Sequence, residues 1–129
     1  MSAEPLSVLL VEDDVHIRSL LELFFSEWGY QATLAPTATE GLRRLLERRF
    51  DIIILDNWLP DLEGVELCRQ IRDFDRKTPI IFYSAATMGS EDVRAFEAGA
   101  NAYISKGTGF GSLREAMAEE LKKADRDGK

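Results

Sequence analysis

The sequence predicts an α/β protein, a single doubly wound (βα)5 three-layer sandwich with helices on both faces of a parallel sheet. Two observations carry this prediction. Five short apolar runs alternate with five segments whose apolar residues recur at helical spacing, and no internal repeat or linker interrupts them. Strands that alternate with helices form parallel sheets with right-handed crossovers. For five strands the common doubly wound order is 2-1-3-4-5, the flavodoxin-like arrangement.

Composition limits the class of protein. The chain has 129 residues, which suits one domain, expected over 1–124, followed by a polar tail at 125–129. A net charge of −7 and a pI of 4.8 argue against direct binding to nucleic acid or an anionic membrane. No apolar run approaches the ~20 residues of a membrane span, and the first residues lack a signal-peptide pattern. The single cysteine, Cys68, excludes an intrachain disulfide, so we expect a cytoplasmic location.

The first strand–helix unit ends its strand in a run of acids. Apolar residues 6–11 predict a strand, and they lead directly into Glu12, Asp13 and Asp14. The next segment has the apolar stripe of an amphipathic helix. We expect Asp14 to be its N-cap and Gly29 to end it.

The second unit begins with a weaker strand over 30–35. Thr37 and Glu40 then have the spacing of a capping box that opens a helix. This helix is expected to bury Leu42, Leu45 and Leu46. Four arginines crowd the helix and its end: Arg43, Arg44, Arg48 and Arg49. Such a cluster is more typical of a solvated face that complements the negative helix terminus than of a nucleic-acid patch.

The central element is an apolar strand that ends in a carboxylate. Ile52, Ile53, Ile54 and Leu55 are consecutive apolar residues, which predicts a strand buried on both faces. Asp56 lies at its carboxyl end, where α/β sheets bind their ligands, and a loop follows. Asp56 is therefore the expected centre of the chemistry.

The remaining elements continue the alternation. Helices are predicted over 63–72 and 91–98, and strands over 80–84 and 101–105. Ser84 ends one strand, and Lys106 follows the other. After a glycine-rich loop at 107–111, the spacing of Ser112 and Glu115 predicts a capping box for a last helix.

The chemically active residue types thus fall at one predicted edge of the sheet: Glu12, Asp13, Asp56, Ser84 and Lys106. Three carboxylates in one crevice raise each other's pKa unless a cation lies among them, and Mg²⁺ suits a site with few protein ligands. A lysine and a hydroxyl opposite them form a socket for a dianionic phosphoryl group. The alternative is that these acids are ordinary helix caps, which are common at such positions.

Four segments, in order and in register, match the pattern of a known family. They are Leu9-Leu10-Val11-Glu12-Asp13-Asp14, Asp56-Asn57-Trp58-Leu59-Pro60-Asp61-Leu62-Glu63-Gly64, Ser84-Ala85, and Ala98-Gly99-Ala100 with Tyr103 and Lys106. Together they resemble the receiver domain of two-component response regulators over nearly the whole chain. No single segment is decisive, but their combination is highly specific.

The resemblance implies a phosphoacceptor that binds Mg²⁺. Asp56 would take a phosphoryl group from the phosphohistidine of a sensor histidine kinase or a phosphotransfer protein. Asp13 would ligate Mg²⁺ directly and Glu12 mostly through water. Asp56 and the backbone carbonyl of Trp58 would complete the protein ligands.

The same resemblance implies a switch. Lys106 would pair with the phosphoryl group, and Ser84 would move to donate a hydrogen bond to it. Tyr103 would then turn inward and alter the face built from the fourth helix, the fifth strand and the fifth helix. Homodimerisation through this face and an output domain beyond residue 129 are further expectations.

Independently of the resemblance, we expect the large Trp58 to screen the acyl phosphate from water and the small Ala85 and Ala86 to keep the other wall open.

One position departs from the family pattern. The family usually has proline after the lysine, often through a cis bond, whereas Gly107 follows Lys106 here. A trans peptide is favoured by roughly 2.5–4 kcal/mol for a non-proline residue. We therefore expect a trans bond and a less pre-set loop, with weaker switching precision or a partner surface of its own shape.

Two other functions compete with this interpretation. A phosphohydrolase of the haloacid dehalogenase type needs a second acid two residues after its nucleophile, but that position is Trp58. A degenerate receiver that acts only as a protein-interaction module has Gly107 as its main support. We expect a phosphoacceptor that assists its own phosphorylation and dephosphorylation, not an enzyme.

Overall fold

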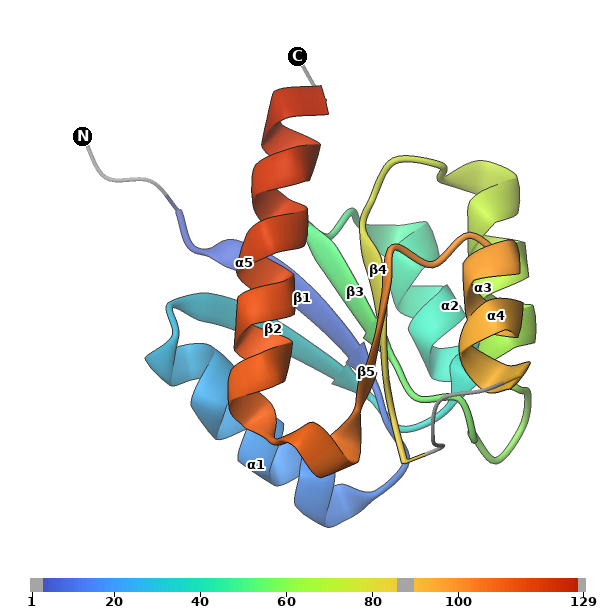
Figure 1. Cartoon of the computed structure of the whole chain (residues 1–129), viewed down its shortest axis with the longest axis horizontal. Helices are drawn as coiled ribbons and strands as arrows, with labels where there is room; N and C mark the ends of the chain where they lie inside the picture. The colour runs from blue at the N-terminus through green and yellow to red at the C-terminus, as the bar shows by residue number, and fades with distance from the viewer. Residues whose placement is uncertain (1–3, 86–89, 128–129) are drawn as a thin grey trace.

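The computed structural model describes residues 4–85 and 90–127, and it confirms the predicted architecture (Figure 1). Five parallel strands form one sheet in the order β2-β1-β3-β4-β5. The elements are β1 Leu6–Val11, α1 Val15–Glu27, β2 Tyr30–Ala35, α2 Ala38–Glu47, β3 Ile52–Leu55, α3 Gly64–Phe74, β4 Ile80–Ser84, α4 Ser90–Glu97, β5 Ala102–Ser105, the 3-10 turn η1 Lys106–Thr108 and α5 Phe110–Asp127.

The two strands that carry acids at their ends are neighbours in the sheet. Val11 of β1 pairs with Leu55 of β3, and the N–H of Asp56 donates to the carbonyl of Val11 at 3.0 Å. Residues Ile52–Leu55 are fully buried, because helices cover both faces of the sheet. Glu12 and Asp56 are therefore held at the same edge by strands whose ends are in register.

Each face of the sheet has its own apolar core. Helices α1 and α5 cover one face, and α2, α3 and α4 cover the other (Figure 1). The first core includes Val8, Leu10, Leu21, Phe25, Ile52, Ile54, Ile81, Tyr83, Leu113 and Met117. The second includes Leu9, Val11, Ile53, Leu55, Val65, Leu67, Cys68, Ile71, Ile80, Phe82 and Ala95. Consecutive residues of β1, β3 and β4 alternate between the two cores, as the period of two in a strand requires. Each fully buried aliphatic side chain contributes roughly 1.5–3 kcal/mol.

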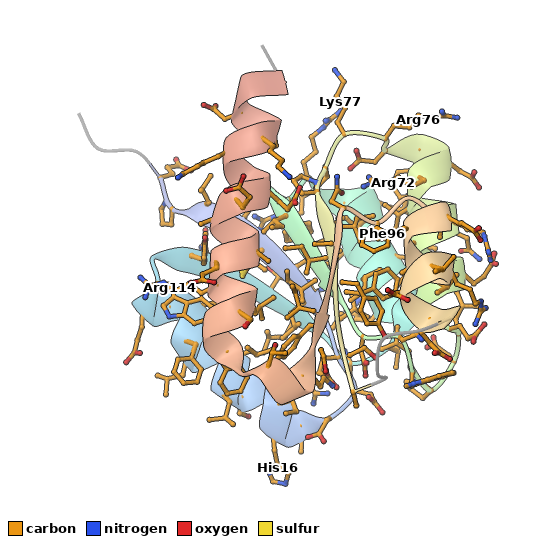
Figure 2. All side chains as sticks on the ribbon, in the orientation of Figure 1. His16, Arg72, Arg76, Lys77, Phe96 and Arg114 are labelled. Carbon is orange, nitrogen blue, oxygen red and sulfur yellow. The ribbon has the colours of Figure 1, made fainter. Side chains whose placement is uncertain are left out.

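The ends of α1 are those that the sequence predicts. The Asp14 carboxylate accepts hydrogen bonds from the N–H groups of His16 and Ile17 at 2.8 and 3.2 Å, so it is the N-cap. Gly29, with φ of 91°, has the left-handed conformation that commonly follows a helix. His16 points away from the molecule in the first turn of α1 (Figure 2).

Helix α2 departs from the prediction in two ways. Thr37 accepts a hydrogen bond from the N–H of Glu40 at 3.1 Å, but the Glu40 carboxylate turns to Arg43, so half of the capping box forms. Leu42 and Leu45 pack against the core, whereas Leu46 is 72% exposed. The expectation that Leu46 is buried is wrong, because the apolar arc of α2 is wider than the strip that its neighbours cover.

Helix α5 begins earlier than predicted. It starts at Phe110, whose ring lies 4.9 Å from Phe24 and anchors the first turn against α1. Ser112 is consequently the third residue of the helix, and its hydroxyl donates to the carbonyl of Thr108 at 3.4 Å. The predicted capping box at Ser112 is wrong. The helix continues to Asp127, into the stretch predicted as a polar tail, while 128–129 lie outside the described residues.

Candidate functional site

The carboxyl ends of the strands meet at the lower edge of the sheet in Figure 1. Glu12 follows β1, Asp56 follows β3, Ser84 ends β4 and Lys106 follows β5. The structure buries Glu12, Asp56 and Ser84, which are 1%, 6% and 0% exposed. Buried carboxylates need partners, so their presence here marks a specialised site rather than a set of surface caps.

Three carboxylates and one ammonium group come together at this edge. Glu12, Asp13 and Asp56 each place a carboxylate oxygen within 4.8 Å of the others. The Nζ of Lys106 lies 2.8 Å from Glu12 Oε1 and 3.6 Å from Asp56 Oδ2. The Lys106 ammonium thus bridges the acids from β1 and β3, and it pairs more closely with Glu12 than with Asp56.

The electrostatics of the site favour binding of an additional cation. Burial raises the pKa of Asp56, and this rise is opposed but not cancelled by the Lys106 charge, the backbone N–H groups of Asn57 and Trp58 and the Ser84 hydroxyl. Burial also raises the pKa of Glu12, against the hydrogen bond from Lys106 and with the help of the Asp56 charge. Burial acts to lower the pKa of Lys106, but the pairing with Glu12 and Asp56 outweighs it and raises that pKa. The single positive charge of Lys106 therefore does not balance the negative charge of the three clustered carboxylates.

One oxygen of the central carboxylate is available. Asp56 Oδ1 is buried and receives no hydrogen bond from the described part of the chain. An unpartnered buried oxygen is costly, which makes this atom a candidate ligand for a hard cation or a nucleophile toward an incoming group. The oxygen donor set of Glu12, Asp13 and Asp56 fits Mg²⁺.

The loop from β3 to α3 folds back onto Asp56. The N–H of Gly64 donates to the carbonyl of Asn57 at 2.8 Å, and a Cβ on Gly64 would overlap the Asp56 carbonyl oxygen. Asp61 accepts hydrogen bonds from the first two N–H groups of α2, each at 2.9 Å. Within this loop the Trp58 side chain is 50% exposed at the surface.

The expected switch residues lie side by side on β4 and β5. Ser84 pairs with Ser105 in the sheet, and the Ser84 hydroxyl is a hydrogen-bonding neighbour of both Asp56 and Tyr103. Tyr103 is buried, and its ring stacks on Phe82 with centroids 6.0 Å apart. The ring is thus already inward in this structure.

The two flanking positions also have clear places. Ala85 follows β4 and is exposed, and Ala86 lies outside the described residues. None of the described peptide bonds is cis, so Lys106–Gly107 is trans, as predicted. The loop after Lys106 is held by the Ser105 hydroxyl, which accepts from the N–H of Gly107 at 3.2 Å.

Sequence reasoning missed two polar residues beside the site. The Arg18 guanidinium donates to the carbonyls of Glu12 and Asp13 at 2.9 and 2.8 Å, which ties the acidic turn to α1. Asn57 is fully buried, and neither the nitrogen nor the oxygen of its side-chain amide has a hydrogen-bond partner among the residues that the structure describes. A polar residue directly after Asp56 was the available signal for Asn57. Nothing in the spacing of Arg18 shows that it reaches back to the turn.

A parallel sheet in the order 2-1-3-4-5, with two acids after β1, an aspartate after β3 and a lysine after β5, defines a flavodoxin-like α/β domain with an acidic pocket at the carboxyl edge of the sheet. The family of response regulator receiver domains matches residues 8–118, and the chain belongs to that family. The resemblance to receiver domains that the sequence shows is therefore confirmed.

Two of the curated relatives are transcriptional regulatory proteins. The uncharacterised transcriptional regulatory protein YclJ of Bacillus subtilis is 38% identical over 78% of this chain and 44% of its own length. AfsQ1 of Streptomyces coelicolor is 36% identical over 94% of this chain and 53% of its own. The chain therefore spans about half the length of the curated relatives it matches.

Solved structures show the same fold. A CheY-like receiver domain from Methanospirillum hungatei has a TM-score of 0.91 at 28% identity, covering 95% of this chain and 98% of that one. The receiver domain of a Pseudomonas aeruginosa sensor histidine kinase, with magnesium coordinated in its active-site cleft, has a TM-score of 0.84 at 28% identity. That match covers 92% of this chain and 98% of the other.

Among the described residues, no helix is both long and apolar enough to cross a membrane.

Proposed function

We propose that Asp56 accepts a phosphoryl group from the phosphohistidine of a sensor histidine kinase or phosphotransfer protein, and that this switches a partner-binding surface. One observation carries the proposal. The Asp56 carboxylate is buried, its Oδ1 has no hydrogen-bond partner in the part of the chain that the structure describes, and the Lys106 ammonium lies 3.6 Å from its Oδ2. A reactive oxygen with a cation beside it is the arrangement that phosphoryl transfer requires.

Mg²⁺ is the proposed cofactor. Glu12, Asp13 and Asp56 would hold it with the backbone carbonyl of Trp58, and their clustered oxygens fit a hard divalent cation. When bound, Mg²⁺ would neutralise charge on the phosphoryl oxygens.

In the proposed transfer an Asp56 carboxylate oxygen attacks phosphorus in line with the donor imidazole. The new O–P bond forms as the N–P bond breaks, and the electron pair of that bond leaves on the imidazole nitrogen. Lys106, paired with Glu12 in this structure at 2.8 Å, is close enough to turn toward the phosphoryl group. The Ser84 hydroxyl, a neighbour of Asp56, would donate a hydrogen bond to the same group.

The proposed switch couples Ser84 to Tyr103. Because the Ser84 hydroxyl neighbours both Asp56 and Tyr103, its move toward a phosphoryl group would change what holds the tyrosine ring. The inward, Phe82-stacked ring would then be favoured over an outward one. A changed α4–β5–α5 face is the expected output, and exposed Val93 and Phe96 on α4 supply apolar area for a homodimer there.

Several finer points belong to the same proposal. The domain assists its own phosphorylation and dephosphorylation but turns over no other substrate. It acts in the cytoplasm, and an output domain beyond residue 129 would read the switch. A degenerate receiver that never carries phosphate is the alternative, but the buried, cation-paired Asp56 favours the phosphoacceptor.

The test is phosphorylation by a small-molecule donor. Incubation with acetyl phosphate and Mg²⁺ should add one phosphoryl group, observed by intact mass and mapped to Asp56. The Asp56→Asn variant should gain none, and chelation of Mg²⁺ should abolish the wild-type signal. An unmodified wild type under conditions that label a control receiver domain would support the degenerate receiver, and steady release of phosphate on many turnovers would indicate an enzyme.

A further inference from the structure

A second surface lies at the end of the sheet opposite Asp56. The carboxyl-terminal ends of α2 and α3 border a groove of about 640 Å³, which we call the α2–α3 groove. Its relevant lining residues are Leu46, Arg48, Arg49, Phe74, Arg76 and Lys77. Arg49 precedes β3 and Lys77 precedes β4, so the groove lies at the amino-terminal edge of the strands whose other ends carry Asp56 and Ser84.

The two walls of the groove have the same local sequence pattern. The end of α2 and the residues after it read Leu46-Glu47-Arg48-Arg49, and the end of α3 and the residues after it read Phe74-Asp75-Arg76-Lys77. Both segments have the order apolar, acidic, basic, basic. In each case the basic pair lies beyond the last helical residue. Figure 2 shows Arg76 and Lys77 extending from this end of the molecule.

The basic side chains of the groove have spare binding capacity. Within the described part of the chain, Arg48, Arg49, Arg76 and Lys77 form no ion pair, and no side-chain hydrogen bond from them is found. The Arg48 guanidinium lies 4.7 Å over the Phe50 ring, a contact that leaves its N–H donors unused.

The two acids of the groove do not neutralise these bases. The Glu47 carboxylate lies 3.5 Å from Arg43 on its own helix. The Asp75 carboxylate accepts hydrogen bonds from the N–H groups of Lys77 and Thr78 and from the Thr78 hydroxyl, at 3.0, 3.1 and 2.6 Å. Four positive charges therefore face solvent in a protein whose net charge is −7.

The groove also exposes apolar side chains from both walls. Leu46 is 72% exposed and Phe74 is 49% exposed, although both belong to helices whose other apolar residues pack inward. Apolar residues rimmed by basic ones are the complement of a segment that carries apolar and acidic residues together. A nucleic acid would match the charge but would leave Leu46 without an apolar partner, and it would be repelled by the rest of the surface.

We propose that the α2–α3 groove binds an acidic, amphipathic segment of a partner protein. Carboxylates of the segment pair with Arg48 and Arg49 on one wall and with Arg76 and Lys77 on the other. An apolar side chain of the segment packs between Leu46 and Phe74. Because the groove and Asp56 lie at opposite edges of the sheet, this contact holds a partner without covering the phosphoacceptor site.

The test uses a defined probe. A short fluorescein-labelled peptide, with leucine and phenylalanine at helical spacing among glutamates, is titrated with the protein and followed by anisotropy. Two matched peptides replace either the apolar residues by serine or the glutamates by lysine. The parent peptide should bind, and both matched peptides should lose at least about tenfold in affinity.

Protein variants locate the binding. The double variant Arg49→Glu, Lys77→Glu should weaken binding of the parent peptide by at least about tenfold, because like charges then face each other. Phe74→Ser should weaken it by removing one apolar wall. Lys122→Glu changes an exposed lysine of α5 that does not line the groove, and it should leave the affinity unchanged. Circular dichroism and urea unfolding check that each variant is folded.

Several results would overturn the proposal. These are no binding of the parent peptide, equal binding of the serine-substituted peptide, or an equal loss in the Lys122→Glu variant. Binding of a single-stranded oligonucleotide that is lost in the Arg49→Glu, Lys77→Glu double variant would make the groove a nucleic-acid site. Self-association of the wild type that the same double variant abolishes would make it an interface between copies of this chain.

Discussion

Gly64 is the residue that lets the loop after Asp56 close. A Cβ at this position would overlap the Asp56 carbonyl oxygen and would lie 3.0 Å from the Asn57 Cα, and both are backbone atoms that have no rotamer to change. The backbone conformation of Gly64 is an ordinary helical one, so the constraint is close approach and not a left-handed φ. A Gly64→Ala substitution must therefore displace the loop.

The cost follows from two terms. Overpacking against a fixed neighbour costs roughly 1–3 kcal/mol. Displacement of the loop also weakens the Gly64 N–H bond to the Asn57 carbonyl, worth roughly 0.5–1.5 kcal/mol. The higher helix propensity of alanine relative to glycine offsets less than about 1 kcal/mol of this loss, because Gly64 is the first residue of α3. The expected loss is about 2–3 kcal/mol, a large part of the ~5–15 kcal/mol that stabilises a domain.

Urea unfolding followed by circular dichroism measures this loss. Gly111→Ala is the matched control, because Gly111 also lies in the first turn of a helix, but a Cβ there would meet no atom within 4 Å. The control should be neutral or slightly stabilising. If Gly64→Ala unfolds within about 0.5 kcal/mol of the wild type, the steric reasoning is refuted.

Three further predictions concern single side chains. Burial acts to raise the pKa of Asp75, but hydrogen bonds from Thr78 and Lys77 outweigh it and hold that pKa below its usual value. Its contribution to stability is therefore present above pH ~4 and is lost as the pH falls through the lowered pKa. Asp75→Asn should cost about 1 kcal/mol at pH 7 in urea titrations, and the cost should shrink as the pH falls below ~4; a cost that does not change with pH would contradict this. Burial raises the pKa of Cys68 to about 11, so iodoacetamide should label it at pH 8 only when urea unfolds the protein; fast labelling of the folded protein would show that the thiol is accessible. The exposed Trp58, two residues after Asp56, is expected to screen the acyl phosphate from water, so Trp58→Ala should shorten the phosphorylated lifetime measured by loss of radiolabel, and an unchanged lifetime would remove that role.

The residues at the strand ends show how much of the candidate site the sequence alone can predict. Glu12, Asp56 and Lys106 were predicted to meet, because each follows an apolar run and parallel strands present their carboxyl ends at one edge. The structure brings these three side chains together. The sequence also predicts the trans peptide bond between Lys106 and Gly107, because the trans form of a non-proline bond is favoured whatever the fold around it.

Other features were decided by tertiary packing. The exposure of Leu46 depends on how much of α2 its neighbours cover, and the early start of α5 depends on the contact of Phe110 with Phe24. Arg18 pins the acidic turn through backbone carbonyls, which no spacing rule describes.

The sequence by itself therefore determined which residues end each strand, because the spacing of apolar residues predicts where each strand and helix lies and which of its residues are buried. Only the tertiary structure decided how the charges pair. Lys106 lies closer to Glu12 than to Asp56, and Asp56 Oδ1 has no hydrogen-bond partner within residues 4–85 and 90–127. The physical reason is that periodicity fixes the face of each element, whereas a distance between side chains depends on the positions of both elements at once.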